Sequence, residues 1–461
     1  MRLRNGWISP SGLAVIAISR ADLLTVFAGA ICGKSTFPKE PVLSVAVAAA
    51  AATTIGEARA GGAMGTNSRM LELDLLRGFA VAVMILVVSP GAWEFSYPQL
   101  QHADWHGWTL GDLVFPDFLF GVGMAVGLTV GRSLGQESSE RRFWSKTGRR
   151  VIALILLGLL LNYLAVIGAR LGAAPVGPEE MPELRIPGVL QRIALCYLVA
   201  VAILYATGRR DEAGAWKANV PAIGLIILAI LIGYWILLTR VPVPGFGPGD
   251  LGKAGNLPAY LDRAIFTTPH MWRLGAESWR GPVVYDPEGL LSSLPATANV
   301  LFGVLAAAFW RDLPNRRLPL LLVAGVTLIA VALLLDRFFP INKKLWTSTF
   351  VLLTSGISCL ALLLVGLLAS RRALRKILRP LEVLGGNALL AFSISIFLSM
   401  LISIPFGTGE GAKTLQRRGF EAASLLFTDP YLASFAFALV VLAFILLLIW
   451  PLHRRGMHLR V

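Results

Sequence analysis

The sequence predicts an all-α fold, a polytopic bundle of about ten transmembrane helices. Hydrophobic residues make up 56% of the chain and charged residues 15%, and the mean hydropathy is +0.68. Apolar runs long enough to cross a bilayer, which takes about 20 helical residues, recur along the chain. The Lys and Arg residues gather in short clusters between these runs. Because a soluble domain is far less apolar, we expect an integral membrane protein.

Ten spans are expected from Leu73 onward. Alternate connections between them carry dense Lys and Arg clusters, whereas the connection at 93–112 has no Lys or Arg. Cytoplasmic loops of membrane proteins are enriched in these residues, so the alternation places both termini in the cytoplasm and the 93–112 loop outside. The net charge of +15 is then a topology signal beside an anionic membrane surface, and nucleic acid is not an expected partner. The spans are expected at about 73–92, 113–131, 149–168, 188–207, 219–238, 290–310, 318–336, 347–369, 383–404 and 431–450.

Residues 1–66 differ from the rest of the chain. Their first apolar stretch is interrupted by Arg20 and Asp22, and their second is too short to span a bilayer. We interpret them as a disordered or spurious extension, since Met64 could serve as a start, with a targeting segment as the alternative. The membrane domain is then 67–461. Its long connection at about 239–289 is expected to form an outer lid, because loops of this length are usually functional.

Titratable and aromatic residues are concentrated in the stretch that runs from residue 102 into the second span. His102 and His106 lie four residues apart, so a helical turn would put them on one face. A histidine with a near-neutral pKa can move protons, attack an acyl carbon or bind a metal. The alternative is an interfacial loop whose tryptophans lie at headgroup level. The stretch contains His102, Asp104, Trp105, His106, Trp108 and Asp112.

Charged residues inside the spans are a second group of candidates. Asp74 and Arg77 are three residues apart and share a helix face at the cytoplasmic end of the first span. They are either a structural ion pair or a site where Arg77 receives the phosphates of a nucleotide-bearing donor. Arg192, one turn into the fourth span, requires an acidic partner, for which Asp112 or Asp117 is the natural candidate.

Lys343, Lys344 and Trp346 precede the eighth span. Amphipathic and cationic side chains at such a position are typical of an anchor at the membrane–water interface. We therefore predict an anchoring role for this cluster in preference to a catalytic one.

Six stretches together resemble one known family. They are LELDLLRGFAVAVMILV at 71–87, HADWHGWTLGDLVFPDFLF from residue 102, RIPGVLQRIALCYLVA at 185–200, DPEGLLSSLPATANVLFGVLA at 286–306, INKKLWTSTFVLLTSG at 341–356 and PLEVLGGNALLAFSIS at 380–395. The family is that of membrane-bound heparan-α-glucosaminide N-acetyltransferases and their bacterial relatives. The resemblance covers about 69–461. It implies acyl-CoA-dependent acyl transfer across a bilayer, with a histidine as acceptor.

The resemblance also assigns roles to residues. His102 matches the acyl-accepting position, and Asp104 or Asp112 could orient its imidazole. Val88 is a departure, since the family usually has an Asn there, although Ser89 could supply a neighbouring hydroxyl. The candidate donor-binding residues are Asp74, Arg77, Ser89, Gln191 and Arg192.

The sequence therefore predicts an acyltransferase of the bacterial inner membrane. It would move an acetyl or other acyl group from cytoplasmic acyl-CoA to an amino sugar or similar acceptor on the outer face. Its expected partners are the lipid bilayer, acyl-CoA, a sugar-like acceptor and a second copy of the chain, and no metal is expected.

Two other functions compete with this one. A permease for a polar solute would suit the ten spans and the lid, but no internal repeat is visible in the sequence. A metal hydrolase could use His102, His106 and Asp112 as zinc ligands. A spacing of four residues between histidines often arises by chance, so it is weak evidence for a metal site.

Overall fold

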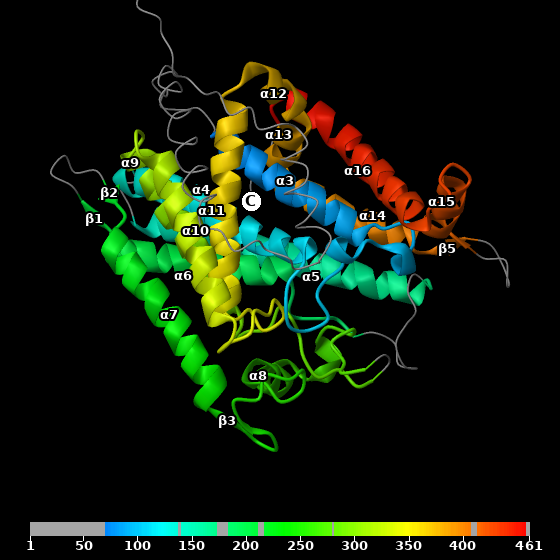
Figure 1. The fold of residues 1–461 in the computed structure, drawn as a ribbon, viewed down its shortest axis with the longest axis horizontal. Coiled ribbons are helices and arrows are strands. Elements are labelled where there is room, and N and C mark those ends of the chain that lie inside the picture. Colours follow the sequence, from blue (N-terminus) through cyan, green and yellow to red (C-terminus); the bar gives the residue numbers. More distant parts are fainter. Residues whose placement is uncertain are drawn as a thin grey trace, which may run out of the picture. The chain divides into compact units, whose positions relative to one another are not determined.

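The structure, a computed structural model, describes residues 70–136, 140–172, 183–210, 216–278, 281–406 and 413–457. The predicted N-terminal extension, 1–66, lies outside these residues. The described part contains fourteen α-helices, α3 to α16, and three short antiparallel hairpins (Figure 1). The prediction of a polytopic helical bundle is confirmed, and the protein is a multi-pass membrane protein.

Ten long or paired helical segments lie where the ten spans were predicted. In the described residues, eight helices are long and apolar enough to cross a membrane, namely α4, α5, α6, α7, α9, α10, α11 and α16. A ninth span results if α13 and α14, which meet at 87°, are counted together. Helix α3 has 18 residues, among them the charged Glu72, Asp74 and Arg77. The count of ten and the cytoplasmic termini stay predictions. The bounds are α3 (Leu71–Val88), α4 (Leu110–Gln136), α5 (Glu140–Arg170), α6 (Val189–Thr207), α7 (Val220–Arg240), α9 (Ser293–Asp312), α10 (Arg317–Leu335), α11 (Ser348–Ala369), α13 (Arg379–Gly386), α14 (Ala388–Ile402) and α16 (Pro430–Arg454).

Short elements connect these helices. The connection predicted as a lid holds one hairpin, α8 and a 3₁₀ turn, so it is folded over much of its length. The short helices are η1 (Trp93–Phe95), η2 (Pro98–Leu100), α8 (Leu257–Phe266), η3 (Thr268–His270), α12 (Arg372–Ile377) and α15 (Leu415–Ser424). The hairpins pair β1 (Arg209–Arg210) with β2 (Trp216–Lys217), β3 (Pro242–Val243) with β4 (Gly247–Pro248), and β5 (Pro405–Phe406) with β6 (Lys413–Thr414).

Helices α4 and α9 form the closest pair in the centre of the bundle. A Cβ atom on Gly123 of α4 would lie 1.8 Å from the carbonyl oxygen of Val300, and one on Gly303 of α9 would lie 2.0 Å from that of Phe120. Glycine at both positions lets the two backbones approach, as small residues do between membrane helices. This contact fixes the start of α4 relative to the segment that leads into α9, and both carry polar residues described below.

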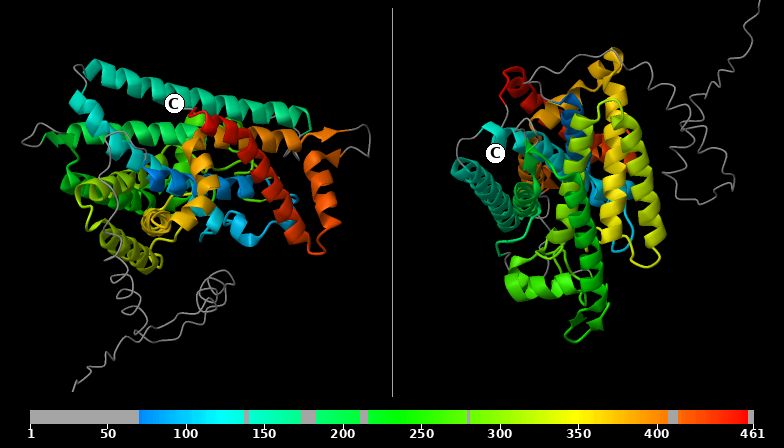
Figure 2. Two further views of the ribbon diagram at one scale, coloured as in Figure 1. Left: turned by 90° about the horizontal axis from the view of Figure 1, so that it is seen from above. Right: turned by 90° about the vertical axis from the view of Figure 1, so that its left-hand side faces the viewer.

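The degree of burial separates central from peripheral helices. Among the candidate spans, α9 is the most buried, at 78% of its apolar window, and α10 the least, at 17%. Helix α10 packs along α11, and the two run side by side in both orientations (Figure 1 and Figure 2). The exposed apolar side chains of α7 and α10, such as Leu225 and Leu334 at 68% each, are suited to contact with lipid. The hydrophobic core lies mainly among α4, α6, α9 and α11.

Candidate functional site

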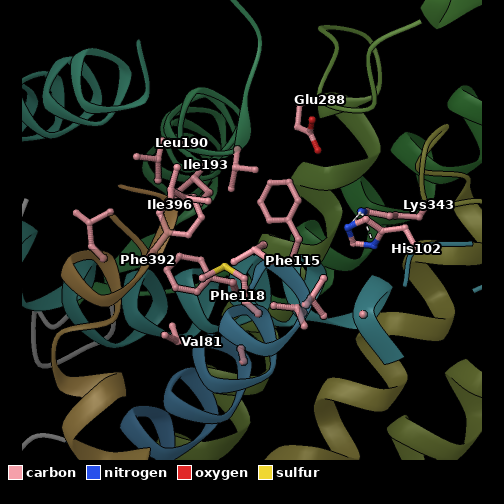
Figure 3. A pocket seen from close by; sticks show the side chains of 18 residues that line it. Val81, His102, Phe115, Phe118, Leu190, Ile193, Glu288, Lys343, Phe392 and Ile396 are labelled. Carbon is pink, nitrogen blue, oxygen red and sulfur yellow. Dashed lines mark hydrogen bonds between the residues drawn. The ribbon is translucent and has the colours of Figure 1, made fainter. Parts of the chain in front are cut away.

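A cavity of about 170 Å³ lies between α3, α4, α6 and α14. In the part of the chain that the structure describes, its lining is apolar except for His102, Glu288 and Lys343. Figure 3 shows His102 and Lys343 next to each other on one side, Glu288 near them, and apolar side chains such as Phe118 and Phe392 on the other. The lining comprises Ala80, Val81, Met84, Val87, Val88, His102, Gly111, Val114, Phe115, Phe118, Val189, Leu190, Ile193, Glu288, Lys343, Leu389, Phe392 and Ile396.

Asp112, in the first turn of α4, holds His102 in place. The Nδ1 atom of His102 lies 2.8 Å from Oδ1 of Asp112, whose side chain is completely buried. Oδ2 of Asp112 accepts hydrogen bonds from the backbone N–H of Ala103 at 3.1 Å and of Thr109 at 3.0 Å. The carboxylate therefore fixes the loop and accepts a hydrogen bond from Nδ1–H of the imidazole. Nε2 is then the nitrogen that carries the lone pair, as a base or nucleophile requires.

Lys343 reaches this histidine from the loop before α11. Its Nζ lies 3.2 Å from both ring nitrogens of His102 and 3.6 Å from Oδ1 of Asp112. Burial and the Lys343 charge lower the pKa of His102 below its ordinary value of 6.5, against the opposing effect of Asp112. Burial also lowers the pKa of Lys343, while Asp112 and Glu288 act to raise it.

The prediction that the Lys343 cluster is an interfacial anchor was wrong for two of its members. The side chain of Lys343 is only 12% exposed, and Trp346 is fully buried. The indole Nε1 of Trp346 donates to Oδ1 of Asn299 on α9 at 2.9 Å. This hydrogen bond attaches the loop before α11 to α9. The side chain of Lys343 faces the cavity.

Glu288 lies on the segment that leads into α9 and is held by Arg185. The guanidinium of Arg185 donates from Nε and Nη2 to Asp286, at 2.9 and 2.6 Å, and also contacts Glu288. Burial alone would raise the pKa of Glu288, but the positive charges of Arg185, Arg192 and Lys343 hold it below its usual value. Glu288 is therefore an ionised carboxylate that faces the cavity.

The two aspartates proposed to orient His102 have different surroundings. The Asp104 side chain is 90% exposed and lies 3.3 Å from Nζ of Lys253. Of these two aspartates, only Asp112 contacts the imidazole. The predicted lid does contact the histidine loop, because Nε1 of Trp105 donates to the carbonyl of Leu251 at 2.8 Å.

His106 does not share the surroundings of His102. Residues 101–109 form a loop, so no helical turn places the two histidines on one face. The backbone turns at Gly107, with φ +94°, and the N–H of Gly107 donates to Ile341 at 2.8 Å. Nδ1 of His106 lies 3.4 Å from the Asn342 amide, outside the cavity lining. Across the described residues no group of three His, Cys, Asp or Glu side chains is placed to hold a metal.

None of the five candidate donor-binding residues is among the described residues that line the cavity. The guanidinium carbon of Arg77 lies 5.6 Å from the ring centroid of Phe118, which does line it. Asp74 and Ser89 are buried in or beside α3, and Gln191 donates to the carbonyl of Ile186 at 3.1 Å. Val88, the position that departs from the family, is itself part of the lining.

Arg192 is buried away from both aspartates of α4. Its Nη2 donates to the carbonyl of Gly289 at 3.2 Å and to Oγ of Ser292, and its guanidinium carbon lies 4.9 Å from the Trp346 ring centroid. The predicted pairing with Asp112 or Asp117 was wrong. Arg192 instead joins α6 to the start of α9, near Glu288.

Comparison with known proteins adds an independent finding. Residues 69–241 match the family described as "Heparan-alpha-glucosaminide N-acetyltransferase, catalytic". A heparan-α-glucosaminide N-acetyltransferase from Homo sapiens is 28% identical over 339 residues, which are 64% of this chain and 48% of that relative. The Mus musculus protein of the same name is 26% identical over 336 residues, with the same shares. The chain spans about half the length of these relatives.

Proposed function

We propose that this chain is an integral membrane acyltransferase, since its residues 69–241 match the heparan-α-glucosaminide N-acetyltransferase family. It would transfer an acetyl or other acyl group from acyl-CoA to an amino sugar or a similar acceptor. The observation that supports this most directly is the imidazole of His102, fixed by buried Asp112 at one end of an apolar cavity. A bacterial inner membrane, with the His102 loop on the outer face, is the location proposed for it.

The cavity suits the reactive end of a thioester donor. Along α3 it extends from Ala80 to Val88, about 12 Å at the helical rise of about 1.5 Å per residue. Its deep end lies one helical turn from Arg77, which we propose receives phosphate groups of the donor on the cytoplasmic side. Because the lining stops short of Arg77, we expect the helices beside Arg77 to separate when the donor enters.

The chemistry requires a base or nucleophile at the thioester carbon. Neutral imidazole serves either role, and Asp112 would stabilise the imidazolium that forms. Two routes are compatible with this arrangement. In one, Nε2 of His102 takes the acyl group before the acceptor does, and in the other it removes a proton from the acceptor during direct transfer.

The proposal is tested by acyl transfer with purified His102→Ala and His106→Ala proteins of matched thermal stability, with a panel of amino sugars. His102→Ala should lower turnover by about a hundredfold or more, the usual contribution of a general acid–base group, and leave donor binding largely intact. His106→Ala should cost far less, because His106 does not line the cavity. Full activity of His102→Ala would contradict the proposal. Comparable losses in both variants, with inhibition by chelators, would indicate a metal site instead.

A further inference from the structure

The cavity offers very few groups that can stabilise a negative charge. When a thioester carbonyl is attacked, its oxygen becomes an oxyanion, and enzymes provide hydrogen-bond donors at that position. Among the lining side chains in the described part of the chain, only His102, Glu288 and Lys343 are polar. His102 is needed as base or nucleophile, and an ionised Glu288 has no proton to donate. Among the described residues that line the cavity, Lys343 is therefore the one cation available to the oxygen.

The surroundings of Lys343 hold its ammonium at the reacting position. Before Lys343, the carbonyl of Ile341 accepts a hydrogen bond from the N–H of Gly107 in the histidine loop. After Lys343, the buried side chain of Trp346 fixes the chain. The ammonium has three N–H donors. In the structure its Nζ lies 3.2 Å from Nε2 of His102 and 3.6 Å from Oδ1 of Asp112. It can turn one donor toward a bound ligand and keep its contact with the carboxylate.

We propose that Lys343 is a catalytic residue, whose ammonium donates a hydrogen bond to the thioester carbonyl oxygen and stabilises the oxyanion that forms there. This inference rests on the proposed acyl transfer. When the donor binds, the ammonium moves from Nε2 of His102 to the carbonyl oxygen, and this movement frees Nε2 for its role. Val88 supplies no hydrogen-bonding side chain at the cavity wall, so the oxygen depends on Lys343.

The step balances without another reactant. In direct transfer, the acceptor nitrogen forms a bond to the carbonyl carbon, and its proton passes to Nε2 of His102. The carbonyl electrons move onto the oxygen, where Lys343 stabilises them, and return as the carbon–sulfur bond breaks. The sulfur leaves with the bonding pair and takes the proton from His102, giving free CoA thiol and an amide. Lys343 keeps its three protons throughout.

Lys343 also affects the pKa of His102. A variant of Lys343 should therefore change the pH dependence of the rate, which loss of a purely structural contact would not do. Its charge is one of the causes that lower the pKa of His102, and the other charged groups facing the ring are Asp112 and Glu288. Removal of the positive charge leaves two carboxylates, and these favour the imidazolium. The acid limb of the rate profile should then move to higher pH, since protonated His102 cannot act as base or nucleophile.

The experiment compares Lys343→Met, Lys343→Arg and Lys344→Met in the full chain. Lys344 is a matched control, because its Nζ contacts the carbonyl of Asp104 and it does not line the cavity. We would measure kcat with acetyl-CoA, donor affinity, thermal stability, and the pH dependence of kcat. Lys343→Met should lower kcat by about 100-fold to 1000-fold, as loss of an oxyanion donor does, with little change in donor affinity. Its acid limb should lie above that of the wild type.

Lys343→Arg keeps the charge, so its acid limb should stay at the wild-type position and its kcat should recover in part. Lys344→Met should change kcat by less than about threefold, far below the expected effect at the oxyanion. The inference is wrong if a folded Lys343→Met protein keeps kcat within that range. It is equally wrong if Lys343→Arg and Lys343→Met shift the acid limb by the same amount. If the wild type transfers no acyl group from any acyl-CoA, the proposed function fails, and this inference fails with it.

Discussion

Replacement of Asp112 by Asn should reduce kcat strongly while the fold persists. Oδ2 of Asp112 accepts two backbone N–H bonds, from Ala103 and Thr109, and Oδ1 faces Nδ1 of His102. The side chain of Asn has one oxygen and one NH₂ group. If the oxygen keeps the two N–H bonds, the NH₂ group faces Nδ1. The proton of the imidazole must then move to Nε2, where a base or nucleophile requires a lone pair.

The structure indicates which orientation of Asn has the lower free energy. In the reverse orientation the Asn oxygen accepts from Nδ1–H, and the NH₂ group faces the backbone N–H groups of Ala103 and Thr109. Each of these two N–H groups then lacks an acceptor, which costs about 1–3 kcal/mol. The other orientation leaves both backbone N–H bonds in place, so the wrong tautomer should dominate. A wrong tautomer of this kind lowers kcat by about 10⁴ in a serine-protease triad. Since general-base contributions are about 10²–10⁴, we expect a loss within that range.

The assay is acyl transfer from acetyl-CoA by purified Asp112→Asn, with Asp104→Asn as the matched control. Asp104 is exposed and faces Lys253, so its amide variant should lose far less activity. Thermal unfolding in detergent would establish that both variants fold. An Asp112→Asn protein that folds normally and keeps kcat within about threefold of the wild type, against the hundredfold minimum expected, would refute the reasoning about the tautomer.

Two further predictions concern the donor and the topology. Arg77→Ala should weaken acyl-CoA binding by roughly 10-fold to 100-fold, the value of a hydrogen bond to a charged group, and binding to the wild type should weaken with added salt. If Arg77→Ala folds normally and its affinity for acyl-CoA is unchanged, Arg77 does not bind the donor and acts only as a topology anchor. Single cysteines near Gln101 and in the 239–289 connection should react with an impermeant thiol reagent added outside, whereas one near Ser138, which lies outside the described residues, should not. The opposite labelling pattern would reverse the proposed orientation.

The fold class was predictable because it depends on local properties of the chain. A helix in lipid must satisfy its own backbone hydrogen bonds, so each apolar run of sufficient length becomes a helix wherever it lies. The segments predicted at 113–131 and 347–369 correspond closely to α4 and α11 for this reason. The break between α13 and α14 was not predicted, although Gly385, Gly386 and Asn387 mark its place in the run at 383–404.

The residue cluster at His102 was also visible in the sequence, but its partners were not. Asp104 and Asp112 are equivalent candidates by composition, and only the loop conformation decides that Asp112 reaches Nδ1. Lys343 lies 241 positions from His102, and on sequence grounds it resembled an interfacial anchor. The contact of α4 with α9, and the pairing of the loop at Gly107 with that at Ile341, bring His102, Glu288 and Lys343 to one cavity. Local hydropathy carries no information about such contacts, because they depend on which helices pack together and on how the loops between them are joined.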